Sequence, residues 1–261
     1  MIALSEVQVA LGLLSGSLVG FSLGLVGGGG SILAVPLMVY VVGVASPHVA
    51  IGTSAIAVAA NAAVNLANHA RSGHVKWPCA AVFAGAGVAG AFGGSTLGKM
   101  LDGQRLLIAF ALLMLVVGAL MLRKRAGHGD IAVTLTRNNF PMLAVLGLCT
   151  GALSGFFGIG GGFLIVPALM LATGMPILNA IGSSLVAVTA FGLTTAVSYA
   201  FSGFVDWPLA LLFVAGGVVG GLLGAQLAKS LSHKRTALNN VFAGLIFGVS
   251  IYMIVKSLNA L

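Results

Sequence analysis

Two glycine-rich stretches are the residues of this chain with the clearest capacity for chemistry. They read Gly-Gly-Gly-Gly-Ser at 27–31 and Gly-Ile-Gly-Gly-Gly at 158–162, and each lies between two apolar runs. Because glycine lacks a Cβ and weakens a helix by about 1 kcal/mol relative to alanine, each stretch predicts a helix break. A helix that restarts at Ser31 or Gly162 would point its N–H groups and the positive end of its dipole into the break, which is a geometry that binds anions.

Polar side chains gather on two apolar segments that follow the glycine stretches. Segments 51–70 and 181–201 carry hydroxyl and amide groups, spaced in the first mostly by three, four or seven residues, which places several of them on one helical face. They could line a substrate path, or they could form hydrogen bonds between helices worth about 1 kcal/mol or less each. The candidate substrate-binding residues are Gly28, Gly29, Gly30, Ser31, Thr53, Ser54, Asn61, Asn65, Gly160, Gly161, Gly162, Ser183, Ser184 and Thr195.

The composition places these residues inside a membrane. Of the 261 residues, 59% are hydrophobic and only 6% are charged, whereas soluble domains carry about 25% charged residues. The net charge of +8 does not indicate nucleic acid as a partner, because the basic residues are few and lie in short loops, where they act as topology signals. Cys79 and Cys149 form no metal-binding or disulfide pattern. We therefore expect an all-α, polytopic, multi-pass membrane protein in contact with the lipid bilayer.

Ten apolar segments follow one another along the chain. Segments 32–44 and 163–172 fall short of the about 20 residues that a spanning helix needs, so we expect half-helices there; whether they span fully or re-enter stays open. A basic connecting loop at 123–139 separates a first transmembrane repeat, 1–122, from a second, 140–261. The ten segments are 7–26, 32–44, 51–70, 77–97, 106–122, 140–157, 163–172, 181–201, 207–227 and 237–255.

The two halves of the chain are an internal duplication. A shift of 130 residues places Ala-Ile-Gly-Thr-Ser (50–54) on Ala-Ile-Gly-Ser-Ser (180–184). The same shift places the Gly-x-Val-x-Trp-Pro of 73–78 on that of 203–208. Glycines spaced four residues apart also form ladders, which let helix backbones approach closely in lipid. A shift of 131 residues superposes Gly16, Gly20, Gly24, Gly27, Gly29, Gly30 and Pro36 on Gly147, Gly151, Gly155, Gly158, Gly160, Gly161 and Pro167.

The distribution of basic residues favours an inverted arrangement of the repeats. If each glycine break turns the chain back to its starting side, each repeat crosses an odd number of times, and nine Lys/Arg residues fall on one side against three on the other. If each hairpin counts as one crossing, the split is seven to five. Because cytoplasmic loops are rich in Lys and Arg, we prefer inverted repeats with both termini outside the cytoplasm. Each repeat would then hold a glycine-broken hairpin plus three spanning helices, a design typical of secondary transporters.

The chain lacks the residues that other functions would need. Its acidic residues lie in or near loops, so no carboxylate is available in mid-membrane for a cation. No phosphate-binding loop, HExxH, GxSxG or paired carboxylates are present, so we expect neither an enzyme nor a cofactor or metal. The four acidic residues are Glu6, Asp102, Asp130 and Asp206.

These motifs together resemble the TauE/SafE sulfite exporter family of membrane permeases. The resemblance rests on the paired glycine motifs that end at Pro36 and Pro167, on the two Ala-Ile-Gly motifs and on the two Gly-x-Val-x-Trp-Pro motifs, and it covers about residues 8–255. It implies secondary transport, without ATP, of sulfite, sulfoacetate or another organosulfonate, in the export direction across the cytoplasmic inner membrane. The alternative is a regulatory or channel-like membrane protein that binds an anion without transporting it. The exact substrate, the coupling ion (with protons as a candidate), the net direction and a homo-oligomeric state stay open.

Overall fold

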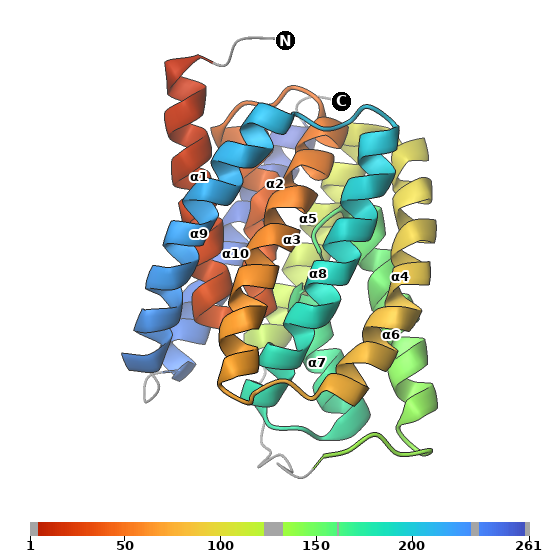
Figure 1. Ribbon diagram of the computed structural model, residues 1–261. Helices are drawn as coiled ribbons and strands as arrows, with labels where there is room; N and C mark the ends of the chain where they lie inside the picture. Colours follow the sequence, from red (N-terminus) through yellow and green to blue (C-terminus); the bar gives the residue numbers. More distant parts are fainter. Residues whose placement is uncertain (1–4, 123–132, 161, 231–234, 259–261) are drawn as a thin grey trace.

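The computed structural model describes residues 5–122, 133–160, 162–230 and 235–258, and all regular structure in these ranges is helical (Figure 1). The first half comprises α1 (Glu6–Val26), the 3-10 helix η1 (Gly27–Leu33), α2 (Ala34–Pro36), the π-helix η2 (Leu37–Val41), α3 (Pro47–Arg71), α4 (Trp77–Met100) and α5 (Gly103–Leu122). The second half comprises α6 (Phe140–Phe157), α7 (Gly162–Thr173), α8 (Ile177–Phe201), α9 (Trp207–Ser230) and α10 (Arg235–Leu258).

The helices follow the predicted apolar segments, and the prediction of an all-helical, polytopic membrane protein is confirmed. Among the described residues, α1, α3, α4, α6, α8 and α9 are long and apolar enough to cross a membrane. Helices α3, α4 and α6 each carry a proline in their first turn, where its missing N–H costs no hydrogen bond. Ser46 adds an N-cap to α3, because its hydroxyl accepts a hydrogen bond of 3.4 Å from the Val49 N–H.

The first glycine break differs from the prediction. Helix α1 passes directly into the 3-10 helix η1, so Ser31 lies inside a helical turn and the first half-helix does not begin there. A 3-10 helix eclipses side chains three residues apart, a cost that consecutive glycines avoid. Gly30 then packs against α1, where a Cβ would collide with the backbone of Ser22 and Leu23.

The second glycine break is a left-handed turn. Helix α6 ends at Phe157, and Gly158 (φ +68°) and Gly160 (φ +64°) adopt the left-handed conformation that glycine allows without strain. Helix α7 then begins at Gly162, as predicted. Its 12 residues extend about 18 Å, well short of the roughly 30 Å of a bilayer core, so α7 is a half-helix.

The long helices pair crosswise between the two halves. Helix α1 packs along α9, and α4 packs along α6 (Figure 1). Since α6 repeats α1 and α9 repeats α4, each half contributes its first helix to a pair with the other half. Helices α3 and α8 pack together in the centre, and α5 packs against α10.

The glycine ladders explain how closely these pairs approach. A Cβ at Gly16, Gly20 or Gly24 of α1 would collide with the backbone of α9, and one at Gly147, Gly151 or Gly155 of α6 would collide with the backbone of α4. Helices without a hydrophobic effect to drive them together gain from such close packing. The prediction of ladders that let helix backbones approach closely is therefore confirmed.

The two halves begin at opposite ends of the bundle. In Figure 1, α1 and α3 both begin at the top, whereas α6 and α8 begin at the bottom, and α10 ends at the top. Each glycine hairpin thus returns the chain to the end from which it came. This arrangement favours an inverted relation between the repeats, whose sidedness in a membrane stays a prediction.

Candidate functional site

Gly160, in the second break, lies between the two central helices. A Cβ built at Gly160 would be 2.8 Å from Val58 Cγ1 of α3 and 3.3 Å from Val188 Cγ1 of α8. Val58 and Val188 are equivalent positions under the 130-residue shift of the duplication. The tip of the second break therefore lies where the two halves of the chain meet.

The first break approaches the same region. The helix η1 packs against both α7 and α8, and Ser31 within it is fully buried. Of the other predicted glycines, Gly28 and Gly29 lie in η1 and Gly162 begins α7, whereas Gly161 is outside the described residues. The structure therefore brings the described parts of the two motifs together inside the bundle.

Asn61 is the most unusual polar residue of the interior. It is fully buried, and neither its amide nitrogen nor its amide oxygen has a hydrogen-bond partner among the described residues. The amide lies against α9, where a Cβ at Gly217 would collide with it. Asn65, one turn further along α3, donates a hydrogen bond of 2.9 Å from Nδ2 to the Asn61 carbonyl oxygen. Because Gly217 also contacts Gly20 of α1, the two amides lie at the α1–α9 crossing, about two turns before the first break.

Two further buried polar side chains without a hydrogen-bond partner among the described residues lie near the other break. Thr195 of α8 and Ser154 of α6 are both fully buried, and neither hydroxyl has a partner in the described chain. Helices α4 and α8 meet at Gly87–Phe191 and at Ser95–Ser198, so Thr195 lies at the level between these contacts. Gly155, next to Ser154, contacts Ala91 of α4 at the same level. Two buried polar side chains thus lie within about two helical turns of each break.

The sequence did not single out Ser154, and the duplication explains why. Its equivalent under the 131-residue shift is Leu23, so the repeat offered no polar counterpart. Asn61 is the opposite case, because here the first half has the polar residue and its equivalent in the second half is the apolar Phe191. Phe191 is fully buried and stacks on Phe83 with ring centroids 6.3 Å apart. An amide in one half therefore stands where the other half has an aromatic ring.

Ser54 and Ser184 are equivalent residues with equivalent bonds. Each is fully buried, and each hydroxyl donates to the carbonyl oxygen three residues earlier, Ile51 at 3.0 Å and Ile181 at 2.7 Å. These local bonds satisfy the hydroxyl protons and leave the oxygens able to accept. A role in substrate binding stays a prediction for both serines.

Thr53 and Ser183 have a structural partner. The Thr53 hydroxyl accepts a hydrogen bond of 3.0 Å from the Asp206 N–H, and the Ser183 hydroxyl accepts one of 2.8 Å from the Lys76 N–H. Asp206 and Lys76 directly precede α9 and α4, so each hydroxyl binds the approach to a helix of the other half. A role in substrate binding stays a prediction for both residues.

The interior is suited to a ligand with hydrogen-bonding capacity. Leaving a buried polar group without a partner costs about 1–3 kcal/mol, and such groups are few in native proteins. Three residues with such groups, Asn61, Ser154 and Thr195, lie within about two helical turns of the breaks. Among the described residues, no three His, Cys, Asp or Glu side chains are placed to hold a metal ion.

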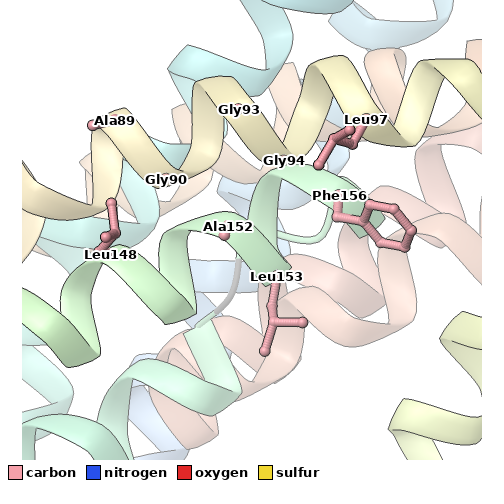
Figure 2. A pocket seen from close by; sticks show the side chains of 9 residues that line it. All are labelled: Ala89, Gly90, Gly93, Gly94, Leu97, Leu148, Ala152, Leu153 and Phe156. Carbon is pink, nitrogen blue, oxygen red and sulfur yellow. The ribbon is translucent and has the colours of Figure 1, made fainter.

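Two cavities of the described chain lie away from these residues. One of about 440 Å³ is an apolar groove between α4 and α6, lined by Gly90, Gly93, Leu148 and Phe156 among others (Figure 2). Another of about 220 Å³ lies at one end of the bundle. Neither includes a predicted site residue. The described residues of the glycine breaks therefore line neither cavity.

Comparison with known proteins gives consistent matches along the chain. A model of the family described as sulfite exporter TauE/SafE matches residues 12–253. A "probable membrane transporter protein" of Xylella fastidiosa (strain 9a5c) is 57% identical over 245 residues, which cover 93% of this chain and 94% of the relative. The "probable membrane transporter protein YunE" of Bacillus subtilis is 29% identical over 249 residues, covering 87% of this chain and 90% of that protein. No solved structure matches.

Proposed function

Since the chain belongs to the TauE/SafE sulfite exporter family of membrane proteins, we propose that it is a secondary transporter for a small sulfur-containing anion. The proposed cargo is sulfite, sulfoacetate or another organosulfonate, moved in the export direction across the cytoplasmic inner membrane. The names of its relatives indicate membrane transport, which is not an enzymatic activity.

The unsatisfied amide of Asn61 is the observation that carries the proposal. A fully buried amide without partners is costly unless a ligand or water supplies hydrogen bonds in another state of the protein. Its NH₂ group donates to anionic oxygens, and a sulfonate or sulfite group presents several of these. The N–H groups at the start of α7 add the positive end of a helix dipole without a buried lysine.

Alternating access is the mechanism that we infer for the cargo. The glycine hairpins enter from opposite ends of the bundle and meet beside α3 and α8. Rocking of the α1–α9 pair against the α4–α6 pair, each of which combines helices of both halves, would open the anion site first to one end and then to the other, as in carriers with inverted repeats. Neither of the two cavities described above is lined by a described residue of the breaks, which fits a closed conformation between the two open ones.

Flux into proteoliposomes tests this proposal. Radiolabelled sulfite, sulfoacetate, taurine and sulfate are compared with and without an imposed pH gradient, and empty liposomes serve as the control. We expect protein-dependent movement of sulfite or one sulfonate, and a response to the gradient would identify proton coupling. Anion binding by folded protein without any flux would favour the alternative of a regulatory or channel-like binding protein. If the folded protein neither binds nor transports any of the four anions, the choice of cargo is wrong.

A further inference from the structure

A polar cavity lies at one end of the bundle, apart from the glycine breaks. Its volume is about 220 Å³, and it opens between the end of η2, the start of α5 and the end of α10. The lining residues with polar side chains are Tyr40, Gln104, Lys256 and Ser257. On a comparable measure one water needs about 10–15 Å³, so the cavity has room for an oxyanion together with waters.

Among the described residues, the ammonium group of Lys256 is held in place by aromatic rings and a hydroxyl group and not by an ion pair. Its Nζ donates a hydrogen bond of 3.3 Å to the Tyr252 hydroxyl and lies 5.6 Å from the ring centroids of both Tyr40 and Tyr252. The two rings meet edge to face, with centroids 5.4 Å apart. The described residues place no carboxylate in an ion pair with Lys256. Aromatic faces attract a cation but leave its charge able to bind an anion.

The hydroxyl groups of the lining contribute a further donor. Tyr40 Oη and Ser257 Oγ are 2.9 Å apart, and Ser257 is only 1% exposed. Only one of these two hydroxyls can donate in their shared bond, so the proton of the other is left for a second acceptor. The Gln104 side chain adds two N–H donors to the same lining. A positive charge and several donors therefore converge on a space whose described lining includes no carboxylate.

We propose that this cavity binds a tetrahedral oxyanion, for which a phosphate group is the model. The group could belong to an anionic lipid or to a free anion, because both present the same oxygens to Lys256 and the hydroxyls. The cavity lies at an end of the transmembrane helices, the level at which headgroups contact a membrane protein. The site is separate from the one proposed for transport, and no residue belongs to both.

Ligand-dependent stabilisation of the purified full-length chain tests the site. The thermal unfolding midpoint is measured with increasing inorganic phosphate, and separately after reconstitution into vesicles of phosphatidylcholine with and without phosphatidylglycerol. We expect the midpoint to rise with phosphate or with phosphatidylglycerol. Substitution Lys256→Gln should lower the apparent affinity for the anion, read from the shift of the midpoint, roughly tenfold or more, because it removes the charge-assisted hydrogen bond. Arg105→Gln is the matched control, since Arg105 is exposed at the same end but does not line the cavity.

The outcomes separate the sources of the anion and can overturn the site. A response to phosphate in solution identifies a free oxyanion, and a response only to phosphatidylglycerol identifies a lipid headgroup. An unchanged response in Lys256→Gln, or an equal loss in Arg105→Gln, would show general charge attraction and refute the site, as would no response at all. If Lys256→Gln does not fold, Gln104→Met removes donors and gives the same test. Asn61→Leu should keep the response, which makes this result independent of the transport proposal.

Discussion

Thr53 and Asp206 lie 153 positions apart, yet the Asp206 N–H donates a hydrogen bond of 3.0 Å to the Thr53 hydroxyl. The equivalent bond in the other half joins Lys76 to Ser183 at 2.8 Å. The glycine next to Thr53 also packs closely against the other half, because a Cβ at Gly52 would collide with the Phe204 carbonyl oxygen. The repeated motifs therefore bind one another crosswise, and this reciprocal contact joins the two halves.

Removal of the Thr53 hydroxyl should weaken the fold. Thr53→Val leaves the Asp206 N–H without an acceptor, so we expect a loss of about 1 kcal/mol in the free energy of unfolding. Thr189→Val is the matched control, because that hydroxyl bonds only within its own helix, to Leu185. Unfolding by denaturant and flux per folded molecule are measured together. A drop in flux without a loss of stability would instead assign Thr53 to substrate binding.

Asn61→Leu should have the opposite effect, with loss of transport but no loss of stability. The substitution replaces an amide that has no partner, so the free energy of unfolding should stay the same or rise by about 1–3 kcal/mol. Flux should be abolished, because the proposed anion ligand is lost. Asn65→Leu provides the contrast, since the Asn65 amide already donates a hydrogen bond within α3 and its removal should give no gain in stability. Normal flux through Asn61→Leu would refute the role proposed for this residue.

Gly160→Ala should be more damaging than the same change at Gly174. Both glycines have positive φ, +64° and +70°, so alanine costs about 1–2 kcal/mol of backbone strain at either position. At Gly160 the new Cβ would also be 2.8 Å from Val58 Cγ1, whereas nothing lies within 4 Å at Gly174. We expect Gly160→Ala to lose additional stability and most of the flux, and Gly174→Ala to lose only the strain term. Equal losses in thermal unfolding would contradict the close packing at the second break.

Gly20→Ala should push α1 away from α9. The added methyl group would collide with the Gly217 carbonyl oxygen, and overpacking of this kind typically costs about 1–3 kcal/mol. Gly93→Ala is the control, because its Cβ would meet nothing within 4 Å and would face the groove shown in Figure 2. We expect a lower unfolding midpoint for the first variant, and for the second an unchanged free energy of unfolding or a gain of up to about 1 kcal/mol, because alanine favours a helix more than glycine does. A neutral Gly20→Ala would mean that the two helices can separate without cost.

The helices were predictable because their signals are local and strong. Apolar runs of about 20 residues, punctuated by glycine and proline, place α4 and α6 almost to the residue. The form of the first break was not predictable in this way. Four glycines permit either a 3-10 turn or a left-handed turn, and only packing of Gly30 against Ser22 and Leu23 decides between them.

The site was predictable only in part, because residue type does not reveal the partner. Thr53 and Asn61 look equally suitable in the sequence, but the first receives a backbone N–H and the second receives nothing. That difference arises from contacts between distant helices. Ser154 and the cavity beside Lys256 were missed for the same reason, since each depends on residues that only the fold brings together.

The exchange of Asn61 for Phe191 between the halves has an energetic consequence for a carrier. Two identical inverted halves would give two open states of equal free energy, so the empty protein would face each side half of the time. An amide in one half and a stacked ring in the other remove that equality. Under the proposed mechanism the empty carrier therefore has a preferred resting orientation, and its apparent affinity for cargo differs between the two faces by the ratio of those populations. The gradients of the cargo and of any coupled ion still determine the net direction of transport, but this bias determines which side the empty carrier faces at rest.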